Sequence, residues 1–327
     1  MQHERINIWN GNEYSYSGAF GFMPNLHTYL HEDREPRPCV LVIPGGGYRM
    51  VVPPEGEIVA KCFYEKGYQA FVGTYTTNYL DLEPLKDQPL RDLSRMLRLI
   101  RSRAEEFRVI PDRIVICGFS AGSHLCGSLG VHWMDLQDSR YGSVSGRPDG
   151  VILSYPVITA GEFAHRDSFR ALLGNDPEEK ELEYWSLEKE VTPDTPPMFL
   201  WQTAADGLVP VENSLLMAMA LKKAGVPFEI HVFPRGMHGL SVSNEDWAKG
   251  NFGEPYTMEQ MACIAYAAEA GKVSVPPEKM EGLKFFLHPE TVDPSAFPAV
   301  TPLPEVAVWP ELADRWIRLN VLTSSAF

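Results

Sequence analysis

The sequence predicts an α/β fold in which a doubly wound, mostly parallel sheet is flanked by helices. Short, continuous apolar runs such as residues 39–43 and 150–155 are typical of strands that are buried on both faces of a parallel sheet. Segments with helical spacing alternate with these runs, which is the order of βαβ units. The chain has no internal repeat and no linker between two cores, so we expect residues 1–327 to form a single domain.

The first part of the chain predicts an antiparallel edge and then three strands of the parallel sheet. Strand-like pieces near residues 6–9 and 26–30 lie in a polar and aromatic segment, which favours an edge. Buried strands are predicted at residues 39–43, 70–75 and 113–117. Helices are predicted at residues 54–65, 90–107 and 121–133. The middle helix is amphipathic, because its apolar residues recur at helical spacing: Leu93, Met96, Leu97, Ile100 and Ala104.

The second part of the chain continues the alternation and contains two long excursions. Strands are predicted at residues 150–155, 198–203 and 228–233, and helices at residues 211–224 and 311–319. Residues 159–195 form a charged lid region between two strands. Residues 241–305 form an insertion before the last helix. Residues 258–270 of this insertion can form a helix, whereas eight prolines between Pro276 and Pro310 exclude a long helix in its second half. Excursions of this length are usually functional loops or partner contacts.

The charge balance and the cysteines narrow the classes of partner. A formal net charge of -14 argues against a nucleic-acid partner, because phosphate binding needs clustered Lys and Arg. No apolar run approaches the roughly 18 residues that span a membrane, and the N-terminal residues show no signal pattern. The five cysteines are odd in number and fit no metal or redox spacing. We therefore expect no membrane partner, no metal site and a cytoplasmic location.

The pattern that carries chemistry is Gly118-x-Ser120-x-Gly122, between a strand-like run at residues 114–117 and small and apolar residues at 121–129. This is the pattern of a nucleophile elbow, a sharp turn from strand to helix that exposes a serine hydroxyl. A side chain two residues before or after the serine would collide with neighbouring backbone, and glycine removes the Cβ. The pattern predicts Ser120 as a catalytic nucleophile at a helix N-terminus.

A serine nucleophile needs a base within hydrogen-bond reach and a carboxylate that orients the base. In enzymes with a nucleophile elbow, the acid and then the histidine follow the serine along the chain. Asp206 follows one predicted strand and His238 follows the next, so they are the predicted acid and base. Asp194 precedes its strand, and Glu212 is better explained as a charge at a helix start. The other histidines fit this plan less well: His3, His27, His31, His124, His132, His165, His231 and His288. Of these, His124 is expected to pack behind the nucleophile.

An oxyanion hole is predicted from a glycine run that follows the first buried strand. We expect the N–H groups of Gly46, Gly47 and Ala121 to bind the oxyanion, since glycine lets backbone approach a substrate closely. A dinucleotide-binding loop is the rival interpretation, but the G-x-G-x-x-G spacing is missing. Tyr48 and Arg49 follow the run and are predicted to line the acceptor side as substrate-binding residues.

Taken together, these features resemble α/β-hydrolases of the acetyl esterase and acetylxylan esterase-like group, which is related to hormone-sensitive-lipase-type esterases. The similarity covers about residues 38 to 240 and returns at the final helix. The matching motifs are residues 42–48, 55–57, 118–125, 153–158, 168–174, 205–214 and 232–240. The resemblance implies the α/β-hydrolase fold and hydrolysis of small acyl esters, often acetyl groups on xylan-derived sugars.

The sequence departs from this group at one place. In the group the catalytic histidine is followed quickly by the last helix, whereas here residues 241–305 intervene. This insertion is expected to cover the active site, to alter the choice of acceptor or to mediate dimerisation. A surface extension remote from the site is the alternative.

The function predicted on this basis is a serine carboxylic-ester hydrolase that removes short acyl groups, acetyl above all, from xylo-oligosaccharides or related carbohydrate esters. Its partner is a small-molecule acyl ester, homo-oligomerisation is left open, and neither a metal nor an organic cofactor is needed. Two alternatives remain. A serine peptidase of the prolyl-oligopeptidase kind uses the same three residues but normally needs a propeller or peptide-anchoring residues, and the sequence shows neither. A non-catalytic binding protein on this fold would lack the serine, aspartate or histidine.

Overall fold

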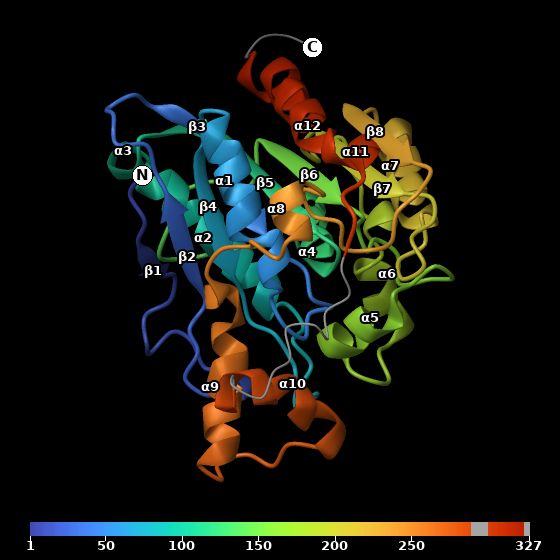
Figure 1. Ribbon diagram of the computed structural model, residues 1–327. Helices are drawn as coiled ribbons and strands as arrows, with labels where there is room; N and C mark the ends of the chain where they lie inside the picture. The colour runs from blue at the N-terminus through green and yellow to red at the C-terminus, as the bar shows by residue number, and fades with distance from the viewer. Residues whose placement is uncertain (289–299, 324–327) are drawn as a thin grey trace.

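A computed structural model of the chain describes residues 1–288 and 300–323. At its centre is an eight-stranded sheet with the order β1-β2-β4-β3-β5-β6-β7-β8 (Figure 1). The antiparallel edge consists of β1 (Arg5–Asn7) and β2 (Asn25–Tyr29). The parallel strands are β3 (Arg37–Ile43), β4 (Gln69–Thr74), β5 (Val109–Phe119), β6 (Gly150–Ser154), β7 (Met198–Thr203) and β8 (Phe228–Phe233). The predicted mostly parallel sheet with an antiparallel edge is confirmed.

Strand β3 shows why the apolar runs of the sequence form this sheet. Cys39, Leu41 and Ile43 belong to the core on one face, and Val40 and Val42 belong to the core on the other face. All five side chains are fully buried. Because successive side chains of a strand point to opposite faces, an unbroken apolar run is what a strand covered on both sides requires.

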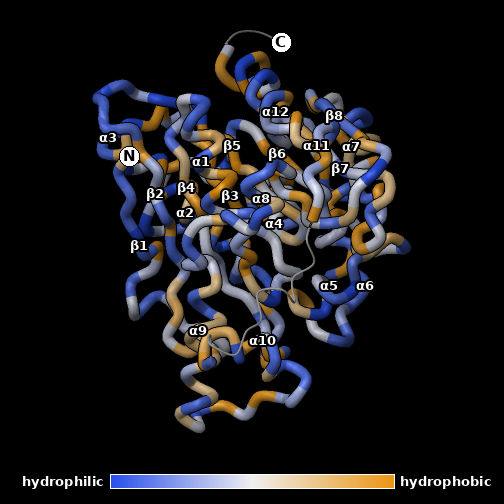
Figure 2. The backbone as a smooth tube through the Cα atoms, viewed as in Figure 1, coloured by the Kyte–Doolittle hydropathy of each residue, from blue (hydrophilic) through white to orange (hydrophobic). Residues whose placement is uncertain are grey.

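Helices cover both faces of the sheet (Figure 1), and Figure 2 shows that hydrophobic residues concentrate along the central strands. One core includes side chains of α1 (Glu57–Glu65), α8 (Glu245–Ala248), α11 (Pro304–Ala307) and α12 (Trp309–Ile317). The other core includes side chains of α2 (Gln88–Ser102), α3 (Ala104–Phe107), α4 (Ala121–His132) and α7 (Glu212–Ala224). None of the described helices is long and apolar enough to cross a membrane.

The two long excursions contain short helices. The lid region holds α5 (Arg166–Leu173) and α6 (Glu179–Tyr184). The insertion holds α9 (Glu259–Glu269) and α10 (Pro277–Leu287), which pack on each other and on Tyr79 and Leu80 after β4 (Figure 1). Helix α10 begins at a proline, which the first turn of a helix accommodates. Residues 289–299 of the insertion lie outside the described residues.

Two predicted helices are interrupted. The helix predicted at residues 90–107 is divided into α2 and α3 at Arg103, whose backbone is not helical (φ −108°, ψ 25°). The helix predicted at residues 54–65 starts as a 3₁₀ turn, Pro53–Glu55, and becomes α1 only after Gly56. Helical spacing of apolar residues continues through such breaks, so the sequence pattern did not reveal them.

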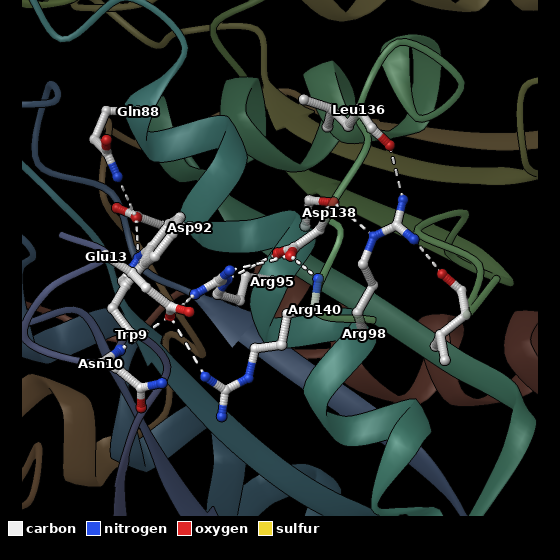
Figure 3. A network of polar contacts seen from close by, with 12 residues as sticks. Trp9, Asn10, Glu13, Gln88, Asp92, Arg95, Arg98, Leu136, Asp138 and Arg140 are labelled. Atoms are coloured by element: carbon white, nitrogen blue, oxygen red, sulfur yellow. Dashed lines mark hydrogen bonds and ion pairs between the residues drawn. The ribbon is translucent and has the colours of Figure 1, made fainter. Parts of the chain in front are cut away.

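A polar network fixes the N-terminal segment to α2 (Figure 3). The indole Nε1 of Trp9 donates to the buried Oδ1 of Asp92 at 2.7 Å, and the Arg95 guanidinium lies 3.8 Å from the Trp9 ring centroid. Arg95 also pairs with Glu13 and Asp138. The edge of the sheet is therefore held by buried charge-assisted contacts as well as by strand pairing.

Candidate active site

The sharp turn predicted around Ser120 is present between β5 and α4. Ser120 adopts φ 52° and ψ −119°, a conformation that non-glycine residues rarely take. A Cβ on Gly118 would lie 2.4 Å from the carbonyl oxygen of Gly122, and a Cβ on Gly122 would lie 2.2 Å from that of Ile43. Neither position has room for a side chain, which is the steric reason for the glycine pattern.

The structure brings Ser120, Asp206 and His238 together. His238, in the loop after β8, has Nε2 2.7 Å from the Ser120 hydroxyl oxygen and Nδ1 2.7 Å from Oδ2 of Asp206. The ionised carboxylate can only accept, so Nδ1 carries the proton and the unprotonated Nε2 accepts from the serine hydroxyl. This row of hydrogen bonds is the geometry needed to remove the serine proton.

The environment of Asp206 keeps its carboxylate charged. Burial acts to raise its pKa, but the His238 hydrogen bond and the N–H groups of Leu208 and Val209 outweigh it, so the pKa lies below its ordinary value. Both N–H groups donate to Oδ1 at 2.9 Å. The second oxygen is thereby left for His238, which fixes the orientation of the imidazole.

The glycine run lies against the nucleophile. A Cβ on Gly45 would lie 2.8 Å from the Cβ of Ser120, and the Gly45 N–H donates to Oε2 of Glu55 at 2.7 Å. Within residues 1–288 and 300–323, the N–H groups of Gly46 and Gly47 have no hydrogen-bond partner. The N–H of Ala121 lies in the first turn of α4, where backbone donors have no partner within the helix.

The predicted substrate contact of Tyr48 is wrong. Its side chain is 1% exposed, and its hydroxyl lies 2.8 Å from Nδ1 of His124. Tyr48 therefore lies inside the core beneath the loop and does not line an open acceptor side. His124 is fully buried, and its ring nitrogens bond to the Tyr48 hydroxyl and the Trp185 carbonyl, so it is a packed residue of the elbow helix.

Arg49 lies on the accessible side of the same loop. One of its guanidinium nitrogens lies 2.7 Å from Oδ1 of Asp81, whose other oxygen pairs with Lys279 of α10 at 2.6 Å. The insertion is thus connected by charge to the loop that follows the glycine run. The substrate contact of Arg49 stays a prediction.

Three residues near the site were missed by the sequence reasoning. Glu55 is 3% exposed and contacts Gly45, and Tyr155 places its ring 4.9 Å from that of His238 at an angle of 69°. His165, at the start of α5, has Cε1 4.0 Å from the position of a Cβ on Gly47. The sequence signal for Glu55 and Tyr155 is that both lie in motifs that match the esterase group. His165 lies in none of these motifs.

The side chains outside this site form neither a disulfide nor a group of metal ligands in the part of the chain that the structure describes. All five cysteines are free, and three of them are buried. No group of three or more His, Cys, Asp or Glu side chains among the described residues could hold a metal ion.

The chain is similar to known proteins in three comparisons. A family model described as BD-FAE matches residues 26–221. Endo-1,4-beta-xylanase B of Butyrivibrio fibrisolvens is 54% identical over 265 residues, which cover 80% of this chain and 42% of that protein. Acetylxylan esterase of Xylanibacter ruminicola is 29% identical over 217 residues, which cover 64% of this chain and 42% of that protein. The chain thus spans less than half the length of both curated relatives.

A solved structure supports the same relationship. The acetyl ester-xyloside bifunctional hydrolase of Caldicellulosiruptor lactoaceticus is 38% identical, with a TM-score of 0.69, and the match covers 83% of this chain and 97% of that one. MGS-M1, an alpha/beta hydrolase enzyme from a Medee basin deep-sea metagenome library, is 25% identical with a TM-score of 0.63, and the match covers 98% of both chains. The α/β-hydrolase fold expected from the resemblance is confirmed by this likeness and by the sheet order.

Proposed function

Because the chain belongs to the BD-FAE family, we propose that it is a serine esterase that removes short acyl groups, acetyl above all, from xylo-oligosaccharides or related carbohydrate esters. The observation that carries the proposal is the hydrogen-bonded row from Ser120 through His238 to Asp206. Two relatives are named for acetylxylan and for acetyl ester and xyloside hydrolysis, which supports both the acyl group and the sugar.

The similarity to a protein named as a xylanase leads to the same proposal. That protein is more than twice as long as its matched part, so its name covers regions that this chain does not span. Glycosidases typically use two carboxyl groups that flank the scissile bond. The site here joins one carboxylate, one imidazole and one hydroxyl, which is the arrangement for acyl transfer.

In the first step, Ser120 Oγ forms a bond to the ester carbonyl carbon while Nε2 of His238 takes the hydroxyl proton. Asp206 stabilises the resulting imidazolium through Nδ1 and keeps the ring in place. The tetrahedral intermediate collapses, the C–O bond to the alcohol breaks, and His238 returns its proton to the leaving oxygen. The serine then carries the acyl group as an ester.

In the second step, His238 removes a proton from water, which attacks the acyl carbon. When the second tetrahedral intermediate collapses, the bond between the acyl carbon and Ser120 Oγ breaks, His238 gives its proton to Oγ, and the acid leaves. Both intermediates carry an oxyanion, for which the N–H groups of Gly46, Gly47 and Ala121 are the proposed donors. Each donor of this kind contributes about 3 kcal/mol to stabilisation of the transition state. Arg49 is proposed to contact the alcohol part of the ester.

The test compares the wild type with Ser120→Ala on three substrates: p-nitrophenyl acetate, acetylated xylo-oligosaccharides and a proline-based amide. We expect the wild type to release acetate from both esters and to leave the amide intact, and the variant to be folded and almost inactive. A Ser120→Ala variant with wild-type activity overturns the nucleophile. Cleavage of the amide alone identifies a peptidase, and no turnover of any substrate identifies a binding protein.

A cytoplasmic location is part of the proposal and rests on the free cysteines, since disulfides are rare in reducing compartments.

A further inference from the structure

We propose that Glu55 is a positioning residue, which holds the glycine run and the His238 loop in one arrangement so that the oxyanion donors and the base act together. The proposal rests on the proposed esterase function. The Glu55 carboxyl group is buried and makes no hydrogen bond to Ser120, Asp206 or His238. It is connected instead to the backbone of the glycine run and, through Tyr155, to the backbone of the His238 loop.

On one side, Glu55 fixes the glycine run. Its Oε2 accepts the N–H of Gly45 at 2.7 Å, and Gly45 lies so close to Ser120 that a Cβ there would be 2.8 Å from the serine Cβ. The bond takes up the Gly45 N–H and leaves those of Gly46 and Gly47 unpaired within the described residues. Movement of Glu55 would therefore change which donors are presented to an oxyanion.

On the other side, Glu55 is connected to the His238 loop through Tyr155. The Tyr155 hydroxyl donates to Oε1 of Glu55 at 2.7 Å and accepts the N–H of Ser241, three residues after His238, at 3.0 Å. The Tyr155 ring packs edge-on against the His238 imidazole. Ser241 also donates its hydroxyl to the carbonyl of Pro54, next to Glu55, at 2.6 Å. The base is thus tied to the turn that carries Glu55 by two routes.

The burial of Glu55 makes its charge significant. Desolvation is the largest influence and holds the pKa of Glu55 above its ordinary value, although the bonds from Tyr155 and Gly45 and the charge of His238 act in the opposite direction. Both oxygens accept hydrogen bonds, one from the Tyr155 hydroxyl and one from the Gly45 N–H, which is the bonding of an ionised carboxylate. From this buried position, the fixed negative charge of the carboxylate favours the imidazolium that forms on His238 during the reaction. Glutamine has the same shape but no charge and only one accepting oxygen, so it can satisfy only part of this arrangement.

The experiment measures kcat and KM of Glu55→Gln on p-nitrophenyl acetate. The number of reactive serines is counted in parallel by labelling with a serine-reactive phosphonate. We expect kcat to fall about 10- to 100-fold, KM to change less than about threefold, and the number of reactive serines per chain to stay unchanged. The matched control is Glu57→Gln. Glu57 is similarly buried but bonds to Lys61 and to the Glu254 N–H, and its variant should keep kcat within about twofold.

A double-mutant cycle with Tyr155→Phe tests the coupling. If Glu55 acts through Tyr155, the double variant loses less activity than the product of the two single losses. Full kcat in Glu55→Gln overturns the inference, and so does a loss that is matched by missing reactive serines, because that shows damage to the fold alone. Ser120→Ala, measured alongside, separates a failure of the esterase proposal from a failure of the role of Glu55. An active Ser120→Ala variant overturns the esterase proposal as well. An inactive Ser120→Ala variant together with a fully active Glu55→Gln variant overturns only the role of Glu55.

Discussion

Nδ1 of His238 lies 2.7 Å from Oδ2 of Asp206, and the other oxygen of this carboxylate accepts two backbone N–H groups. Oδ2 is therefore the oxygen of Asp206 that accepts from His238, which selects the His238 tautomer with the proton on Nδ1. We expect Asp206→Asn to lower kcat by on the order of 10³- to 10⁴-fold, because the amide can donate to Nδ1 and stabilise the wrong tautomer. Hydrolysis of p-nitrophenyl acetate measures the loss. Asp194→Asn, at an exposed position before β7, is the control, and equal rates for the two variants would contradict the assignment.

The two glycines proposed as oxyanion donors should respond differently to alanine. A Cβ on Gly46 would lie 2.2 Å from the carbonyl oxygen of Met50, and the backbone there has φ +126°. A Cβ on Gly47 meets nothing closer than 3.8 Å, at φ +66°. We expect Gly46→Ala to lower kcat more than about 100-fold because the loop must move. Gly47→Ala should lose much less, since a left-handed alanine costs only about 1–2 kcal/mol. Steady-state kinetics of both variants measures the two losses in kcat, and similar losses would contradict the prediction.

His165 is expected to contribute to substrate affinity. Its Nδ1 lies 2.8 Å from the Ser168 hydroxyl, and its Nε2 has no partner among the described residues. Burial and the nearby charge of His238 lower the pKa of His165, so the ring is neutral near pH 7 and Nε2 can bond to a substrate. His165→Ala should raise KM for acetylated xylo-oligosaccharides about 5- to 10-fold, the value of one hydrogen bond. His31→Ala serves as the control because His31 stacks on Tyr64. An unchanged KM for His165→Ala would exclude the contact.

Acid should destabilise the fold through His124. Nε2 of His124 donates to the carbonyl of Trp185, and Nδ1 accepts from the Tyr48 hydroxyl, so the buried ring is neutral. Burial lowers its pKa from 6.5 to about 4. Between these values the unfolded chain binds a proton that the folded chain does not. His124 therefore does not reduce the free energy of unfolding above pH 6.5. As the pH falls toward 4, its titration lowers the free energy of unfolding by about 3 kcal/mol in all.

Urea unfolding at pH 7.5 and pH 5 measures this effect. The free energy of unfolding of His124→Gln should change less between the two pH values than that of the wild type, because glutamine does not titrate. An identical pH dependence in the two proteins would show that another group is responsible.

Much of the fold follows from local patterns in the sequence. The strands were predicted well because a strand covered on both faces needs an unbroken apolar run, as β3 and β7 show. Ser120 was predicted because the sharp turn has no room for a side chain two residues before or after the serine, so that glycine is required at both places. The order of the predicted strands along the chain then located Asp206 and His238. In these cases the physical requirement acts on residues that are close in sequence.

The contacts that were missed depend on side-chain directions in irregular backbone. Tyr48 directly follows the glycine run, but its left-handed backbone (φ 58°) lies in a turn without periodicity, and its side chain is buried against His124. Glu55 meets Tyr155 across 100 residues of sequence, and no local pattern records such a contact. The break at Arg103 was hidden because apolar spacing continues on both sides of it.

Two hydrogen bonds hold the two ends of the insertion next to each other. The Ser243 hydroxyl accepts the N–H of Leu303 at 3.0 Å, and the Trp309 indole donates to the carbonyl of Ser241 at 2.8 Å. Because both ends meet at this point, the insertion leaves and rejoins the rest of the chain beside the His238 loop. Exchange by protein engineering has to keep the parts of the insertion that pack on the rest of the protein: Trp247 of α8 is buried in the core, and Gln260 of α9 accepts the N–H of Thr77. Segments that keep these contacts are the ones expected to alter acceptor preference while the catalytic loop stays in place.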